Sequence, residues 1–190
     1  MRVVIDLSEQ DLEHFRAAMR RAKEAAAHLS AAEITGAAMQ LLEDTKGVQV
    51  PEFVSSRMKR LGTLVGMVHD TNWGISDEER KEILSALTYF SDPNDAIPDD
   101  IPVLGFLDDA IMIELVVEEL KHEIDAYEDF CLFRKQAEDD IGAVEASGLN
   151  RDDWLQQRQN ELLDRMRGRR SRDSASYGGG RGGFSLFSIR

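Results

Sequence analysis

The stretch from Ser91 to Asp109 constrains the fold more than any other part of the chain. Its sequence is SDPNDAIPDDIPVLGFLDD, which places three prolines and six aspartates between two apolar segments. Each proline fixes its own φ, lacks an N–H donor and pushes the preceding residue out of the helical region. The chain must therefore turn here, so the apolar segments on either side are separate elements joined by a rigid connection.

Outside this stretch, apolar residues recur every three or four positions, which is the pattern of amphipathic helices. A serine followed three residues later by glutamate marks two helix starts, at Ser30 with Glu33 and at Ser76 with Glu79. Residues 2–7 alternate apolar and polar side chains, so we expect a short extended segment there. We predict an all-α fold, a bundle of about six helices. The expected helices cover residues 8–29, 30–45, 51–68, 76–90, 104–131 and 151–167, and the fifth either continues to residue 144 or is followed by a separate helix.

The most apolar part of the chain, AIMIELVV at Ala110–Val117, predicts the most buried helix of the bundle. Eight residues are too few to cross a bilayer, which needs ~20, so we expect no transmembrane segment. The N-terminus reaches an acidic helix start before an apolar run of signal length accumulates. Cys131 is the single cysteine, so no disulfide can form within the chain. We therefore expect a cytoplasmic protein.

The net charge of −13 is unevenly distributed along the chain. Residues 165–190 hold seven arginines and one aspartate, giving +6, so residues 1–164 carry −19. A body this acidic repels phosphate backbones, and we expect nucleic acid to be contacted only weakly, through the Arg-rich tail. The predicted organisation is a helical domain over residues 1–167 and a disordered tail, rich in Arg and Gly, over residues 168–190.

The end of this tail is more apolar than a solubilising segment requires. We predict that it docks in a groove of a protein partner or folds back on its own bundle. Incidental apolar residues in a disordered end are the alternative. The residues of this candidate partner-binding segment are Phe184, Leu186, Phe187 and Ile189.

Two interpretations fit the Asp- and Pro-rich stretch. In the structural one, aspartates cap helical turns or lie in the first turn of the next helix, where each negative charge contributes ~0.3–1 kcal/mol. Its motif residues are Asp92, Pro93, Asp95, Pro98, Asp99, Pro102, Gly105, Asp108 and Asp109. In the alternative, carboxylates hold a divalent cation, because hard cations prefer several oxygen ligands. Its candidate ligands are Asp92, Asp95, Asp99 and Asp100. The structural interpretation explains more of the residues.

The segment YFSDPNDAIPDDIPVLGFLDDA, Tyr89–Ala110, resembles the signature of the YkvA-like family, a bacterial domain of unknown function. The Ile-Pro-Asp and Ile-Pro-Val-Leu-Gly runs of that signature and its closing Asp-Asp are present. Asn94, Ala96 and Asp100 depart from it. The family core would cover residues 51–131. The resemblance implies a helical hairpin with a fixed loop, and it implies no established reaction.

The remaining residues do not complete a catalytic constellation. Glu119 and His122 form one Glu-x-x-His unit, whereas a di-iron helical bundle uses two. No Gly-rich phosphate loop precedes a lysine, and no serine or cysteine lies in a nucleophile motif. We therefore predict a non-enzymatic helical protein-interaction module without a cofactor. The alternative is a divalent-metal protein of hydrolytic type that uses the aspartates of the loop.

Overall fold

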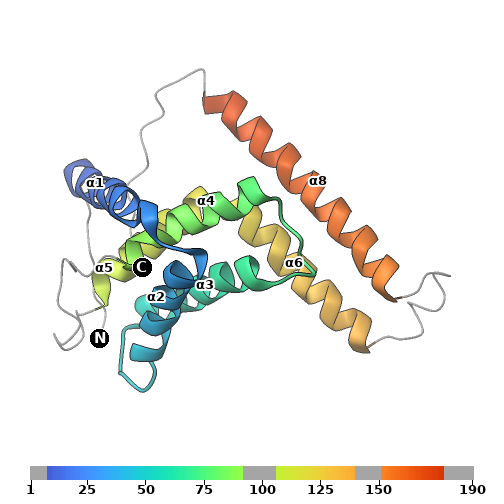
Figure 1. Cartoon of the computed structure of the whole chain (residues 1–190), viewed down its shortest axis with the longest axis horizontal. Helices are drawn as coiled ribbons and strands as arrows, with labels where there is room; N and C mark the ends of the chain where they lie inside the picture. Colours follow the sequence, from blue (N-terminus) through green and yellow to red (C-terminus); the bar gives the residue numbers. More distant parts are fainter. Residues whose placement is uncertain (1–7, 92–105, 140–150, 178–190) are drawn as a thin grey trace. The chain divides into compact units, whose positions relative to one another are not determined.

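The computed structural model describes residues 8–91, 106–139 and 151–177 (Figure 1). These ranges contain seven α-helices, two short 3-10 helices and no strand, which confirms the all-α prediction. The expected extended segment at residues 2–7 and the expected tail beyond residue 177 lie outside them. The elements are α1 (Glu9–Ala25), η1 (Ala26–His28), α2 (Ala31–Asp44), α3 (Glu52–His69), α4 (Asp77–Leu87), η2 (Thr88–Ser91), α5 (Leu107–Glu119), α6 (Lys121–Asp139) and α8 (Arg151–Tyr177).

The described residues divide into two compact units. Unit 1 holds those in the ranges 8–68 and 76–119, and therefore α1, α2, α4, η2, α5 and nearly all of α3. Unit 2 holds those in the ranges 69–75 and 120–177, and therefore α6, α8 and the segment that follows α3.

Capping boxes fix where three helices of unit 1 begin. At the starts of α1, α2 and α4, a serine hydroxyl accepts from the backbone N–H three residues on, and the acidic side chain there accepts from the serine N–H. At Ser30 these two bonds are 3.3 and 2.7 Å long. The starts predicted at Ser30 and Ser76 are confirmed, and Ser8 begins α1 in the same way. Each such cap contributes ~1 kcal/mol.

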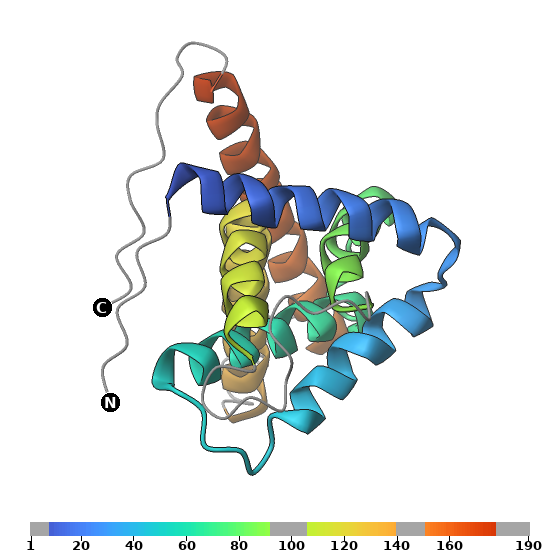
Figure 2. The same ribbon diagram turned by 90° about the vertical axis from the view of Figure 1, so that its left-hand side faces the viewer.

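The interior of unit 1 is built from α3, α4 and α5. The fully buried large side chains there include Leu61, Leu64, Ile83, Leu87, Met112 and Ile113. α5 was predicted as a deeply buried helix, and its residues 110–113 are all buried. α1 and α2 follow each other across a short turn (Figure 2). Both helices contact η2, so the N-terminal part of unit 1 holds the chain just before the Asp- and Pro-rich stretch begins.

α6 and α8 form an antiparallel pair in unit 2 (Figure 1). Near the start of α6, Glu123 pairs with Arg170 of α8, and near its other end Phe133 stacks on Trp154. The apolar side chains buried in this unit include Ile124, Phe130, Leu162 and Met166. Full burial of such a side chain contributes ~1.5–3 kcal/mol, so the pair has an apolar interior of its own.

Two helix boundaries differ from the sequence-based expectation. The helix expected over residues 104–131 is interrupted at Leu120, which separates α5 from α6 and lies at the border between the units. α6 then continues to Asp139. The last helix ends at Tyr177 and not near residue 167, so the Arg-rich residues 168–177 are helical despite Gly168. Contacts of this end of α8 with α6, given below, supply the physical reason.

Candidate functional site

The described end of the Asp- and Pro-rich stretch lies in unit 1. Asp108 and Asp109 occupy the first turn of α5, as the sequence predicts. Their side chains are buried, with 1% and 5% of the residue surface exposed, and each has an interaction partner. Burying a carboxylate is costly unless it is paired, and the N-terminal end of a helix favours negative charge. Both carboxylates therefore belong to the interior of unit 1.

The rest of the predicted motif lies in the range 92–105, outside the described residues, as does the apolar end of the tail. The undescribed site residues are Asp92, Pro93, Asp95, Pro98, Asp99, Asp100, Pro102, Gly105, Phe184, Leu186, Phe187 and Ile189. Across the ranges that the structure does describe, no three His, Cys, Asp or Glu side chains are grouped so that they could hold a metal ion. The metal site at the loop thus stays a prediction from the sequence.

One ion pair joins α3 to α5 inside unit 1. Arg57 Nε donates to Glu114 Oε2 at 2.8 Å, and about a quarter of each side chain is exposed. The Arg57 guanidinium also lies 4.3 Å from the centre of the Phe53 ring. With its charge matched by a carboxylate and its flat face covered by an aromatic ring, Arg57 fixes the position of α5 against α3.

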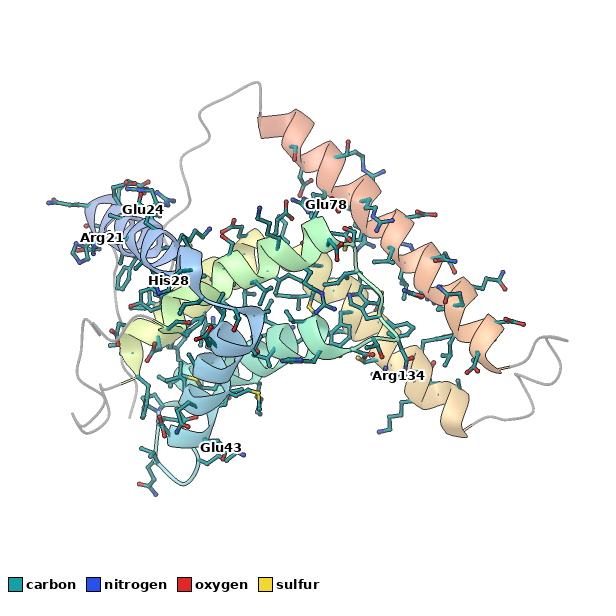
Figure 3. The ribbon with its side chains drawn as sticks, viewed as in Figure 1. Arg21, Glu24, His28, Glu43, Glu78 and Arg134 are labelled. Carbon is teal, nitrogen blue, oxygen red and sulfur yellow. The ribbon has the colours of Figure 1, made fainter. Side chains whose placement is uncertain are left out.

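The outer face of α2 exposes apolar side chains. Among the described residues, three large apolar residues are exposed by roughly half or more, namely Met39 at 51%, Val48 at 48% and Leu132 at 57%. Met39 lies on α2 and Val48 in the connection to α3. Ala32 and Gly36 are exposed on the same side of α2 as Met39, and α2 contains no lysine or arginine. The exposed Glu43, labelled in Figure 3, marks the last turn of the helix.

A polar cluster in unit 2 is centred on Asp70, just after α3. Its Oδ2 accepts from Arg134 Nη1 at 2.7 Å and from the Tyr127 hydroxyl at 3.2 Å, and its Oδ1 accepts from the backbone N–H of Asn72 at 3.0 Å. Arg134, labelled on α6 in Figure 3, also donates to Cys131 Sγ at 3.7 Å. Asp70 therefore ties the segment that follows α3 to two side chains of α6.

The protonation states in this cluster favour anchoring over catalysis. Burial raises the pKa of Tyr127 well above its usual range, and the neighbouring Cys131 and Asp70 raise it further. Burial alone would lower the pKa of Arg134, but the hydrogen bond and negative charge of Asp70 outweigh it, so the pKa is raised. A tyrosine that keeps its proton and an arginine that keeps its charge serve as fixed donors. Neither is poised as a general base near neutral pH.

Trp73 is the buried anchor of the same segment. It is fully buried, and its ring centre lies 5.6 Å from that of Tyr127 and 5.3 Å from that of Phe130. Its carbonyl accepts from Gln159 Nε2 of α8. Gly74 follows with φ of +57°, and a Cβ there would lie 2.5 Å from the same Gln159 nitrogen. Only glycine satisfies both the backbone angle and the available space.

Charged pairs hold the end of α8 to the start of α6. His122 Nε2 and Asp173 Oδ2 are 2.7 Å apart, and Lys121 Nζ lies 3.5 Å from the same oxygen. The hydrogen bond with His122, followed by that with Lys121, lowers the pKa of Asp173. Arg170 Nη1 donates to Glu123, which is buried, at 3.1 Å. His122, considered above as half of a di-iron unit, thus has a carboxylate of α8 as its partner.

Of the comparisons with known proteins, one finds a match, and it covers one segment of the chain. A family model described as "Protein of unknown function (DUF1232)" matches residues 80–115, from α4 through η2 and the Asp- and Pro-rich stretch into α5. No curated protein and no solved structure matches the chain. The match confirms that this segment resembles an uncharacterised domain family. It confirms neither the YkvA-like name nor a reaction.

The sequence predicts no transmembrane segment. The helices of the described ranges include none with an apolar span of membrane-crossing length.

The cluster around Asp70 was not predicted from the sequence. Its members are 57 and 64 residues apart in the sequence, and the run DTNWG carried the one available signal, a turn followed by a tryptophan beside a glycine.

Proposed function

We propose that the chain is a non-enzymatic protein-interaction module that binds a protein partner through the outer face of α2 and the connection to α3. The half-exposed side chains of Met39 and Val48 carry this proposal. The match to an uncharacterised family and the YkvA-like resemblance are compatible with it, because neither brings a reaction. A cytoplasmic location belongs to the same proposal.

The chemistry of this surface suits a partner with an apolar anchor. Methionine is flexible and polarizable, and it is common at surfaces that accept other proteins. Interfaces bury such side chains at their centre and keep polar groups at the rim. Glu43 and Asp44 are exposed at the end of α2, and Lys46 of the connection pairs with Glu43, which leaves Asp44 as the carboxylate without a cation among the described residues. A partner segment with one or two apolar side chains and a single Lys or Arg beside them fits this pattern.

α2 is also a firm support for a binding surface. Its opposite side buries Ile34, Ala38 and Leu41, and a capping box fixes its first turn. Contacts with η2 and α4 hold it within unit 1. Binding side chains on a packed helix lose little conformational freedom when a partner arrives, which favours affinity.

Affinity capture followed by binding of the purified partner tests the proposal. The full chain is compared with the double variant Met39→Glu plus Val48→Glu and with Leu132→Glu. The last is the matched control, since Leu132 is equally exposed but lies on α6 of unit 2. We expect one or more proteins to be captured by the wild type and the control and lost by the double variant, with circular dichroism unchanged because no buried side chain is altered.

The captured protein must then bind the purified chain directly. Its affinity should fall by about tenfold or more when both charges are introduced into an apolar contact. Equal capture by the double variant and the wild type contradicts the proposal. A deletion that tests the tail has to begin after Tyr177, because a cut at residue 168 would remove the last turns of α8.

A further inference from the structure

One side of α8 carries a row of arginines. Arg158, Arg165, Arg169 and Arg172 are spaced by seven, four and three residues. At 3.6 residues per turn they fall within about 60° of the helix circumference and span ~21 Å along the axis. Trp154, at the beginning of the helix, falls on the same side. We call these five residues the arginine face of α8.

The arginine face is accessible within unit 2. It lies beside the side of α8 that buries Leu162, Leu163 and Met166. The side chains of Arg158 and Arg165 are 28% and 43% exposed, and Arg172 is exposed. A Cβ at Gly168, between these arginines, would meet nothing within 4 Å. Among the described residues of unit 2, the row is therefore partly exposed at Arg158 and Arg169 and exposed at Arg165 and Arg172.

The charges of this face are only partly neutralised by the protein. Glu161 accepts from both Arg158 Nη1 and Arg165 Nη2 at 2.8 Å. Arg158 Nε is buried and has no hydrogen-bond partner. The side chains of Arg169 and Arg172 make no ion pair or hydrogen bond with any other part of the described chain. Between Arg165 and Tyr177 there are five arginines and one aspartate, so this half of α8 carries +4.

An aromatic platform lies at one end of the row. The rings of Trp154 and Phe133 are 4.2 Å apart and inclined by 35°, and both residues are partly exposed. The Arg158 guanidinium lies 5.3 Å from the centre of the Phe133 ring. An arginine row that ends on a partly exposed tryptophan offers cations for phosphate groups and an aromatic ring for a stacked base. Proteins that bind single-stranded nucleic acid combine these two features.

We propose that the arginine face of α8 binds single-stranded nucleic acid, with phosphates on Arg165, Arg169 and Arg172 and a base stacked on Trp154. The cations are arginines without a single lysine in α8, and the guanidinium fork matches phosphate geometry. A membrane surface fits less well, because an interfacial helix needs an apolar side facing lipid and that of α8 is buried against α6. This inference uses unit 2 and does not depend on the proposed function of unit 1.

The acidity of the chain sets the expected strength of binding. A net charge of −13 opposes long-range attraction, but charges beyond the Debye length of ~8 Å are largely screened at physiological salt. Three to four phosphate contacts predict a slope of roughly −2 to −3 in log K against log salt for a single strand. The affinity should then fall by about 15- to 60-fold between 50 and 200 mM salt.

Fluorescence anisotropy of a labelled 12-nucleotide oligouridylate with the full chain at low salt tests the proposal. The variant Arg169→Glu plus Arg172→Glu should weaken binding by about tenfold or more. The matched control is Arg20→Glu plus Arg21→Glu on the exposed surface of α1, which makes the same change in charge and should leave binding nearly unchanged. Binding should also quench tryptophan fluorescence, and Trp154→Phe should remove that quenching while it keeps an aromatic ring on Phe133.

Several outcomes overturn the proposal. Absence of binding by the wild type at about 50 mM salt, or equal weakening by the two double variants, removes the arginine face as the site. Binding to vesicles of anionic phospholipid without binding to the oligonucleotide assigns the face to membranes instead. Loss of binding on deletion of residues 178–190, with no effect of Arg169→Glu plus Arg172→Glu, assigns it to the tail. Quenching that persists in Trp154→Phe removes the stacked base.

Discussion

Units 1 and 2 are both helical and both contain polar contacts between residues far apart in the sequence, such as Arg57–Glu114 in unit 1, but local sequence patterns account for more of unit 1. In unit 1, serine caps within the helices and apolar side chains every three or four residues account for most of what is seen around α2, α3 and α4. In unit 2, the pair α6 and α8 and the segment after α3 are joined by polar contacts between residues 47 to 86 positions apart, such as Arg170–Glu123 and Gln159–Trp73.

The difference shows which part of a helical fold can be found in a sequence. Caps and periodicity act over three or four residues, so they can be recognised locally. Other groups cannot be interpreted without their partners, which lie far along the chain. Examples are the buried carboxylate of Glu123, the carbonyl of Trp73 and the guanidinium of Arg170. Unit 2 should therefore be sensitive to single polar or backbone changes that unit 1 would tolerate, and the following predictions test this contrast.

The largest effect is expected at Gly74. In Gly74→Ala the left-handed backbone costs ~1–2 kcal/mol and the displaced Gln159 leaves the Trp73 carbonyl unsatisfied, for a total loss of about 2–4 kcal/mol. Gly36→Ala in α2, where a Cβ meets nothing, should instead stabilise by about 0.5–1 kcal/mol. Both tryptophans lie in unit 2, so denaturant unfolding followed by their fluorescence measures Gly74→Ala, and circular dichroism, which reports all helices, measures Gly36→Ala. Equal effects of the two substitutions would contradict the contrast.

The next effect is expected at the polar cluster around Asp70. Asp70→Asn keeps the shape but removes the charge that Arg134 pairs with, and should destabilise by about 1.5–3 kcal/mol. A double-mutant cycle with Arg134→Met measures the coupling directly, and we expect about 1 kcal/mol or more because the two residues are in contact. A coupling energy near zero would show that the pair does not hold the segment in place.

A smaller loss is expected when one cap of unit 1 is removed. Ser76→Ala deletes the hydroxyl that accepts from the Glu79 N–H, and should cost ~1 kcal/mol. The loss should be visible in circular dichroism, which reports all helices. A Ser76→Thr variant is the control, because it keeps the accepting oxygen. If Ser76→Ala were as damaging as Gly74→Ala, unit 1 would not be the more tolerant unit.

The smallest effect is expected when the pH is lowered, because two of the cap carboxylates then become protonated. Hydrogen bonds from the cap serines lower the pKa of Asp11 and Glu33 below their usual values of 3.8 and 4.5. A carboxyl with a lowered pKa stabilises the fold above its unfolded pKa and stops doing so as the pH falls through the folded one. We expect the first turns of α1 and α2 to fray below about pH 4. Amide exchange between pH 6 and 3 measures this, and the double change Ser8→Ala plus Ser30→Ala should reduce the pH step, because only the backbone N–H of each cap residue then donates to the carboxylate.

The helix content and several helix starts could be predicted from the sequence, whereas two boundaries could not. The starts at Ser30 and Ser76 follow from residues three positions apart. The break at Leu120 follows no proline or glycine, and the apolar pattern runs through it without a signal. The end of α8 was expected near residue 167 because the segment from Gly168 onward, rich in Gly, Ser and Arg, has the composition of a disordered tail. Its contacts with Glu123 and His122 of α6 lie some fifty residues earlier.

The candidate functional residues also fall into two groups, those that local sequence patterns predict and those that they do not. Asp108 and Asp109 could be placed in the first turn of a helix because their spacing from the prolines is local. The Asp70 cluster and the arginine face of α8 could not be found, because the first needs a loop brought to α6 and the second needs the Arg-rich residues to be helical. In both cases the missing information was the pairing of segments far apart in the chain.

Hydrogen exchange of the backbone amides of residues 168–174 tests whether contacts with α6 keep this polar, Arg-rich stretch helical. If they do, these amides in the full chain are protected well above the level of an unstructured peptide. We also predict that His122→Ala plus Glu123→Gln lowers this protection while the amides of α3 are unaffected. Exchange of residues 168–174 at the rate of a free chain in the wild type would contradict this prediction.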